Sequence, residues 1–240
     1  LVIHLLNWES DKRLMNTQTI AVAIDGPAGA GKSSISKVVA KKLGYLYIDT
    51  GAMYRSVTWA VLHDGIDPTD QAAVEAILPS LDLTMEPTEE ACKVFVRGQD
   101  VTSLIRTPEV NNAVSEVASH KGVRQYLVDR QRLMAKAGGV ILDGRDIGSV
   151  VLPDADLKVY LTASVEARAQ RRYLEVKDSD PSLTLEAIRE NVEHRDYLDM
   201  NRDESPLVCV DDAVVVDSSN LTFNQTVDRL TSLIEEASHE

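Results

Sequence analysis

Cysteine is scarce in this sequence of 240 residues, which contains only Cys92 and Cys209. The two lie far apart and belong to no Cys-x-x-Cys or Cys/His spacing, so neither a disulfide framework nor a structural zinc site is predicted. The five histidines show no metal-ligand spacing either. Scarce cysteine is typical of proteins of the reducing cytoplasm, where we expect this chain to work.

Long hydrophobic runs are missing as well. The apolar start, Leu1–Leu6, is followed at once by the polar and charged segment 7–13, so it is too short and too acidic for a signal peptide. Met15 stands just before a clear strand pattern. We therefore expect residues 1–16 to be an N-terminal extension and residues 17–240 to form the folded domain, with no membrane association.

Basic residues are outnumbered, since 25 lysine and arginine residues face 38 aspartate and glutamate residues, for a formal net charge of -13. An acidic chain repels polyphosphates and anionic lipids, so nucleic-acid polymers and membranes are poor candidate partners. Arginine nevertheless makes up 15 of the 25 basic residues. Its planar guanidinium group binds phosphate and carboxylate groups well, and this preference requires an explanation.

Apolar runs and helical patterns alternate along the chain, as they do in α/β proteins. We expect strands at residues 19–24, 45–48, 140–143, 157–161 and 213–216. We expect helices at residues 33–43, 52–64, 109–136 with a break near Gly122, 165–173, 185–198 and 223–236. Residues 67–106 carry strand-like pieces at 81–85 and 93–97 and a turn at 98–100, typical of a small antiparallel insertion. The predicted fold is an α/β three-layer sandwich with a central parallel sheet.

A glycine-rich loop lies between the first predicted strand and the first predicted helix. It fits the nucleotide-binding pattern G-x-x-x-x-G-K-[ST]. Its residues, with the next one in the helix, are Gly26, Pro27, Ala28, Gly29, Ala30, Gly31, Lys32, Ser33 and Ser34. In such a loop backbone N–H groups surround the phosphates, the lysine reaches the outer phosphates and the serine hydroxyl binds Mg²⁺. We therefore expect a P-loop NTPase fold with ATP and Mg²⁺ as ligands.

The phosphate loop alone does not define the reaction, because it serves kinases, switches and motor proteins alike. The guanine-reading motif Asn-Lys-x-Asp and the transporter motif Leu-Ser-Gly-Gly-Gln are both absent from the sequence. Two motifs at the ends of predicted strands carry arginines instead, DTGAMYR at 49–55 and DGRDIG at 143–148. Ligands bind at that edge of open α/β sheets, so the pattern favours phosphoryl transfer to a small phosphorylated acceptor.

Together with the phosphate loop and the insertion, these motifs make the sequence resemble the bacterial cytidylate kinases, the CMP and dCMP kinase branch of the nucleoside monophosphate kinases, over about residues 17–240. The resemblance implies transfer of the γ-phosphoryl group of ATP to CMP or dCMP, with Mg²⁺ required. It also implies an inserted acceptor-binding subdomain at about residues 50–119 and a short helical lid at about residues 169–205. We expect a monomer.

The same resemblance implies roles for individual residues. The groups expected to act on the transferred phosphoryl group are Lys32, Arg145, Arg168, Arg172 and Arg202. The groups expected to bind the acceptor are Thr50, Arg55, Ser115, Arg124, Arg145, Asp146, Arg195, Asp199 and Arg202. Of these, Ser115, Arg124 and Asp146 would read cytosine, whose amino donor and acceptors call for acceptor and donor partners. Mg²⁺ is expected on Ser33, with Asp143 acting through water.

Several residues have a second interpretation. Each arginine could form an ordinary surface ion pair, and Asp143 could cap a turn instead of organising water around Mg²⁺. We expect Asp25, just before the phosphate loop, to support that loop, whereas Tyr54 suits packing as well as substrate contact. For the whole protein, the alternatives are a kinase acting on UMP, AMP or shikimate, and a protein that binds ATP without turning it over.

Overall fold

The structure of the chain is a computed structural model that describes residues 19–87, 92–136, 138–178 and 182–239. The chain divides into two compact units. Unit 1 contains Thr50–Met134, and unit 2 contains Ile20–Asp49 and Ala135–Glu235. The expected N-terminal extension, residues 1–16, lies outside the described residues. Within the described segments, no helix is long and apolar enough to cross a membrane.

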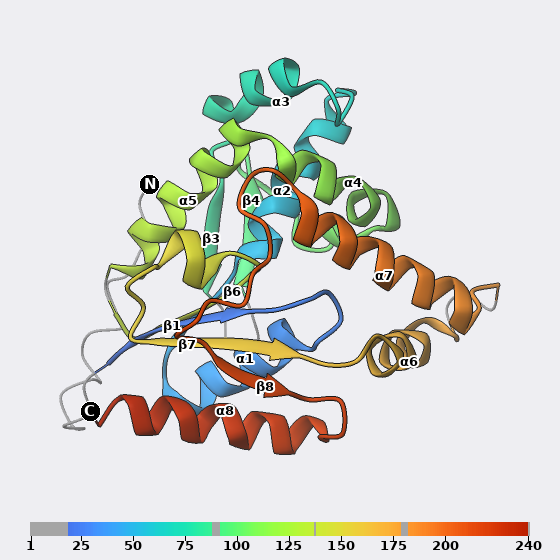
Figure 1. Ribbon diagram of the computed structural model, residues 1–240. Helices are drawn as coiled ribbons and strands as arrows, with labels where there is room; N and C mark the ends of the chain where they lie inside the picture. Colours follow the sequence, from blue (N-terminus) through green and yellow to red (C-terminus); the bar gives the residue numbers. More distant parts are fainter. Residues whose placement is uncertain (1–18, 88–91, 137, 179–181, 240) are drawn as a thin grey trace. The chain divides into compact units, whose positions relative to one another are not determined.

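Unit 2 is built on a five-stranded parallel sheet (Figure 1). In spatial order its strands are β2 (Leu46–Asp49), β6 (Val140–Asp143), β1 (Ala21–Asp25), β7 (Leu157–Thr162) and β8 (Val214–Asp217). All four residues of β6 are buried, as expected for a central parallel strand. Asp143 pairs in register with Ile24 of β1 and with Asp49 of β2. The carboxyl ends of these three strands therefore meet at one edge of the sheet.

The helices of unit 2 follow the strands in the order typical of α/β proteins. They are α1 (Lys32–Leu43), the π-helical turn η4 (Ile147–Val151), α6 (Val165–Val176), α7 (Leu185–Asn201) and α8 (Phe223–Ala237). Helices α1 and α8 lie on the same side of the sheet (Figure 1), where Lys42 forms an ion pair of 3.3 Å with Asp228. The hydroxyls of Ser164 and Thr184 cap α6 and α7, which pack against each other.

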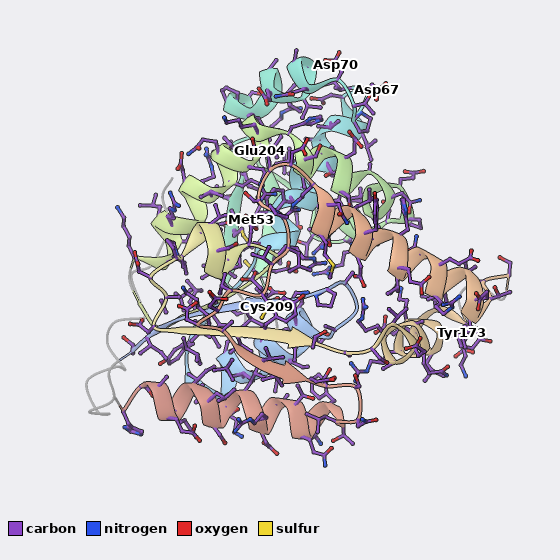
Figure 2. The ribbon with its side chains drawn as sticks, in the orientation of Figure 1. Met53, Asp67, Asp70, Tyr173, Glu204 and Cys209 are labelled. Atoms are coloured by element: carbon purple, nitrogen blue, oxygen red, sulfur yellow. The ribbon has the colours of Figure 1, made fainter. Side chains whose placement is uncertain are left out.

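Unit 1 combines helices with a small antiparallel sheet. Its helices are α2 (Thr50–His63), α3 (Gln71–Ile77), η2 (Leu78–Ser80), η3 (Leu104–Arg106), α4 (Pro108–Ser119) and α5 (Lys121–Ala135), and its strands are β3 (Thr84–Pro87), β4 (Cys92–Val96) and β5 (Gln99–Asp100). Helix α2 packs against α4 and η3 around Met53, Val57 and Ile105, each at most 1% exposed. Asp67 and Asp70 lie close together where α3 begins (Figure 2), and Asp70 caps that helix.

The predicted fold class is confirmed, with a parallel sheet in one unit and an antiparallel insertion in the other. The break expected near Gly122 is found at His120, whose extended backbone ends α4. Two local details differ. The sequence does not predict α3, because this helix is only seven residues long and buries Val74 alone. The turn between β4 and β5 lies at Arg97–Gly98, where φ is positive, so that Gln99–Asp100 form a strand.

Candidate active site

The phosphate loop, residues 26–33, connects β1 to α1 as its sequence predicts. A side chain at Gly26 would place its Cβ atom 1.9 Å from the carbonyl oxygen of Leu161 on β7, so only glycine fits there. Gly31 precedes α1 with φ of 90°, a left-handed conformation that glycine adopts without strain. The loop is therefore held by close packing against β7 and by its own backbone geometry.

Lys32 is the charged group at the centre of this loop and is 5% exposed. Its Nζ atom donates hydrogen bonds to the carbonyl oxygens of Gly26 and Pro27, at 2.6 and 2.8 Å. Burial, followed by the positive charge of Arg145, lowers the pKa of Lys32 well below its ordinary value, and nearby carboxylates only partly offset this. A bound anion would relieve both effects, so the loop is suited to phosphate.

Asp143, at the end of β6, lies beside the first turn of α1. Its carboxylate accepts hydrogen bonds from the hydroxyls of Ser33, at 2.7 Å, and Tyr47, at 2.9 Å. Burial, and then the charge of Asp49, raises the pKa of Asp143 to about 6. The sequence assigns Ser33 and Asp143 to one Mg²⁺ site, and the structure joins them by a hydrogen bond. The sequence gives no signal for Tyr47, which lies inside an apolar strand and has no motif around it.

The oxygens of Ser33 and Asp143 fit a hard cation such as Mg²⁺. Among the residues that the structure describes, no group of three or more His, Cys, Asp or Glu side chains could hold a metal on its own. Mg²⁺ is commonly held by one or two protein carboxylates and completes its shell with phosphate oxygens and water.

Asp25, which the sequence assigns to supporting the phosphate loop, binds the segment after the DGRD motif. Its two carboxylate oxygens accept hydrogen bonds from the backbone N–H groups of Ile147 and Gly148, at 2.8 and 2.7 Å. These two residues begin η4, directly after the DGRD motif. Burial raises the pKa of Asp25 to about 6, although both hydrogen bonds act to lower it. Asp25 therefore ties the start of the phosphate loop to the segment that carries Arg145 and Asp146.

The DGRD segment and the end of α7 form a second charged cluster in unit 2. The Nε atom of Arg145 donates a hydrogen bond to Asp199 at 2.7 Å. Burial acts to raise the pKa of Asp199, but Arg145 and then Arg202 and Arg195 outweigh it and leave that pKa below its ordinary value. Arg202 lies 4.0 Å from Asp146 and donates two hydrogen bonds to the carbonyl of Ser205. The structure thus brings together all five residues that the sequence places here.

The three arginines of α6 have different surroundings. Arg168 is 3% exposed and forms a bidentate ion pair with Asp196 on α7. Arg171 donates hydrogen bonds to the hydroxyl and the carbonyl oxygen of Ser218. Arg172 is 54% exposed and pairs with Glu175 at 3.0 Å on the same helix. Sequence reasoning misses Asp196, because a carboxylate next to Arg195 in a charged helix gives no distinctive signal.

The remaining predicted residues lie in unit 1. Thr50 and Arg55 belong to α2, Ser115 to α4 and Arg124 to α5. Arg124 is 4% exposed, donates a hydrogen bond to the carbonyl of Ala118 at 3.1 Å and stacks over the Tyr54 ring with 5.4 Å to its centroid. Tyr54 thus packs against Arg124, a residue predicted to bind the acceptor. Packing was one of the two roles that the sequence allows for Tyr54, and contact with the substrate was the other. Ser115 and Arg55 are half-buried, and Thr50 is buried.

Comparison with known proteins decides the family. The sequence profile described as Cytidylate kinase matches residues 22–236. The chain belongs to the cytidylate kinase family. It is 48% identical over 220 residues to a cytidylate kinase of Ligilactobacillus salivarius (strain UCC118), covering 92% of this chain and 98% of that protein. It is 46% identical over 215 residues to a cytidylate kinase of Bacillus cereus (strain ATCC 10987 / NRS 248), covering 90% and 96%.

Among solved structures, an uncharacterized protein from Eubacterium ventriosum ATCC 27560 superposes with a TM-score of 0.50 over 90% of this chain and 98% of that one. The two sequences are 11% identical, so this likeness shows the fold alone. The family membership therefore rests on the profile and on the similar sequences.

Proposed function

We propose that the protein transfers the γ-phosphoryl group of ATP to CMP or dCMP, giving ADP and CDP or dCDP. The observation that carries this proposal is the approach of two cations at the end of the parallel sheet. The half-buried Arg145 stands close enough to the buried Lys32 for its positive charge to lower the pKa of Lys32. Like charges held together in this way favour a ligand with several negative charges, as a donor phosphate next to an acceptor phosphate would provide.

The acceptor phosphate is assigned to Arg55, Arg145 and Arg202. Arginine suits this task because its guanidinium group forms paired hydrogen bonds with phosphate oxygens. The sugar hydroxyls are assigned to Arg195 and Asp199. The ion pair between Arg145 and Asp199 supports the assignment. It holds a residue assigned to the acceptor phosphate next to a residue assigned to the sugar before any ligand binds.

Cytosine recognition is assigned to Ser115, Arg124 and Asp146, and Thr50 is assigned to acceptor binding. Cytosine presents an amino donor next to two acceptors, whereas uracil presents a carbonyl where cytosine has the amino group. A carboxylate that accepts a hydrogen bond from the cytosine amino group would face the carbonyl of uracil, and neither acceptor would then have a donor. This disfavours UMP. The burial of Asp146 and Arg124, at 4% exposure each, makes such a mismatch costly.

Catalysis by this arrangement consists of positioning and neutralisation of charge. Lys32 would bind the outer phosphates of ATP, while Arg145 and Arg202 hold the acceptor phosphate in line. Ser33 and Asp143 would hold Mg²⁺, which neutralises negative charge on the phosphate oxygens when bound. Arg172, which is exposed on α6 and pairs with Glu175, is assigned to the transferred group. The proposal includes residues about 50–119 as the acceptor-binding part and about 169–205 as the lid, in a cytoplasmic monomer.

A coupled assay of ADP release tests the proposal against its alternatives. ATP and Mg²⁺ are supplied with CMP, dCMP, UMP, AMP or shikimate at equal concentrations, and the rate is compared with that without an acceptor. We expect a large stimulation by CMP and dCMP only. Equal stimulation by UMP or AMP would refute the assignment of cytosine recognition, and tight ATP binding with no stimulated release would indicate a binding protein without kinase activity.

A further inference from the structure

We propose that Asp196 is a positioning residue that acts through Arg168 on the phosphate loop, so that helix α7 sets the affinity for the phosphoryl donor. The inference rests on the proposed function for its biological meaning. It concerns donor binding, however, which can be measured without turnover. Sequence reasoning places Arg168 on the transferred phosphoryl group and gives Asp196 no role.

Arg168 uses all three of its guanidinium nitrogens within the protein. Its Nε atom donates a hydrogen bond to the carbonyl of Ala163, at 2.9 Å, at the end of β7. One Nη atom donates to the carbonyl of Ala28 in the phosphate loop, at 2.9 Å, and to Asp196 at 3.0 Å. The other Nη atom donates to Asp196 at 2.6 Å. This guanidinium group is thus engaged in supporting the loop, unlike that of Arg172.

The stem of Arg168 also lies against the phosphate loop. A Cβ atom added to Gly29 would come within 3.4 Å of the Cβ and 3.9 Å of the Cδ of Arg168. The loop thus meets Arg168 at the carbonyl of Ala28, and the stem of Arg168 borders the space beside Gly29. These residues lie next to the backbone N–H groups that such a loop turns toward phosphate, so a shift of Arg168 would change how the loop receives ATP.

Asp196 is the group that fixes Arg168 in this position. The two carboxylate oxygens form a paired contact with the guanidinium fork, which sets its orientation as well as its charge balance. The side chains are 4% and 13% exposed. A buried charge left without its partner would seek water or another ligand, so removal of Asp196 would displace Arg168 from Ala28.

Helix α7 carries two aspartates with separate tasks. Asp196 holds Arg168 at the phosphate loop, whereas Asp199, one turn later, holds Arg145 in the DGRD segment. The first contact concerns the donor side and the second the acceptor side. A substitution at Asp196 should therefore weaken mainly donor binding and one at Asp199 mainly acceptor binding, a selectivity that a general loss of structure would not produce.

The experiment measures dissociation constants by calorimetry for ATP with Mg²⁺ and, separately, for CMP, in wild type and variants. We expect Asp196→Asn to weaken ATP binding by about tenfold, or roughly 1.4 kcal/mol, with CMP binding changed less than about twofold. Asp199→Asn should show the reverse pattern. Glu193→Gln is the matched control, because Glu193 lies on the same helix in an exposed pair with Arg189 and should leave both affinities unchanged.

A double variant separates positioning from folding. Replacing a buried ion pair by apolar residues of similar volume is often neutral for stability. We therefore expect Arg168→Met with Asp196→Leu to unfold near the wild-type temperature and still to bind ATP at least about tenfold more weakly. Wild-type ATP affinity in a folded Asp196→Asn or double variant would overturn the proposal, as would equal losses for ATP and CMP. Intact ATP binding without CMP phosphorylation in wild type would instead refute the proposed function alone.

Discussion

The buried carboxyl group of Asp25 makes a quantitative prediction about the pH dependence of stability. Burial is the largest effect on its pKa and raises it from 3.8 to about 6, against the hydrogen bonds from Gly148 and Ile147. A carboxyl group with a higher pKa in the folded protein than in the unfolded chain binds its proton more tightly when folded. Its contribution to stability is therefore complete below about pH 3.8 and is lost as the pH rises through about 6.

The size of this effect follows from the shift. A difference of about 2 pKa units corresponds to about 3 kcal/mol across the whole range, of which roughly 1 kcal/mol falls between about pH 7.5 and about pH 5. Asp25→Asn removes the titrating proton and keeps the shape of the side chain. On acidification over that interval, the free energy of unfolding of wild type should gain roughly 1 kcal/mol relative to that of the variant.

Urea unfolding followed by circular dichroism at the two pH values measures this difference. Other carboxylates, including Asp143, titrate in both proteins, so their effects cancel in the comparison. Asp228→Asn provides the control, since it makes the same chemical change at a side chain that is 72% exposed, and it should follow wild type. Parallel pH dependence of Asp25→Asn and wild type would refute the reasoning about burial.

Three further substitutions test the site. Lys32→Ala should lower turnover by about 10²-fold or more, because it removes the cation that neutralises the transferred phosphate. The affinity for CMP, measured by calorimetry, should stay within about threefold of wild type, and equal losses of turnover and CMP affinity would point to misfolding. Asp146→Ala should bring the kcat/KM values for CMP and UMP within about tenfold of each other, and an unchanged ratio would argue against its role in reading cytosine. Gly26→Ala should destabilise the fold by about 3 kcal/mol or more in urea unfolding, because its Cβ atom would meet the carbonyl of Leu161, and near-wild-type stability would contradict that packing.

The sequence predicts the framework of unit 2 well because its signals are local. The phosphate loop requires particular residues at fixed spacing, and the apolar run before Asp143 can form little else than a buried strand. The approach of Ser33 to Asp143 follows from the parallel order of β1 and β6. These features can be read from residues adjacent in the chain, together with the rule that parallel strands end at one edge.

The partners of the charged groups are not predictable in the same way. The contact of Asp196 with Arg168 joins positions 28 residues apart, and the contact of Tyr47 with Asp143 joins positions 96 apart. Nothing in the sequence near Asp196 or Tyr47 indicates which of several possible partners each will contact. Helix α3 escapes prediction for a related reason, since one buried side chain, Val74, gives no helical periodicity to recognise.

The central claim, that a cytidine monophosphate is the acceptor, is tested most directly by following the label from [γ-³²P]ATP into product. The protein is incubated with labelled ATP, Mg²⁺ and an equal mixture of CMP, UMP and AMP, and the diphosphates are separated by chromatography. The assignment of cytosine recognition to Ser115, Arg124 and Asp146, the last two buried, predicts that nearly all of the label appears in CDP. Label distributed evenly among CDP, UDP and ADP, or released as inorganic phosphate, would contradict it.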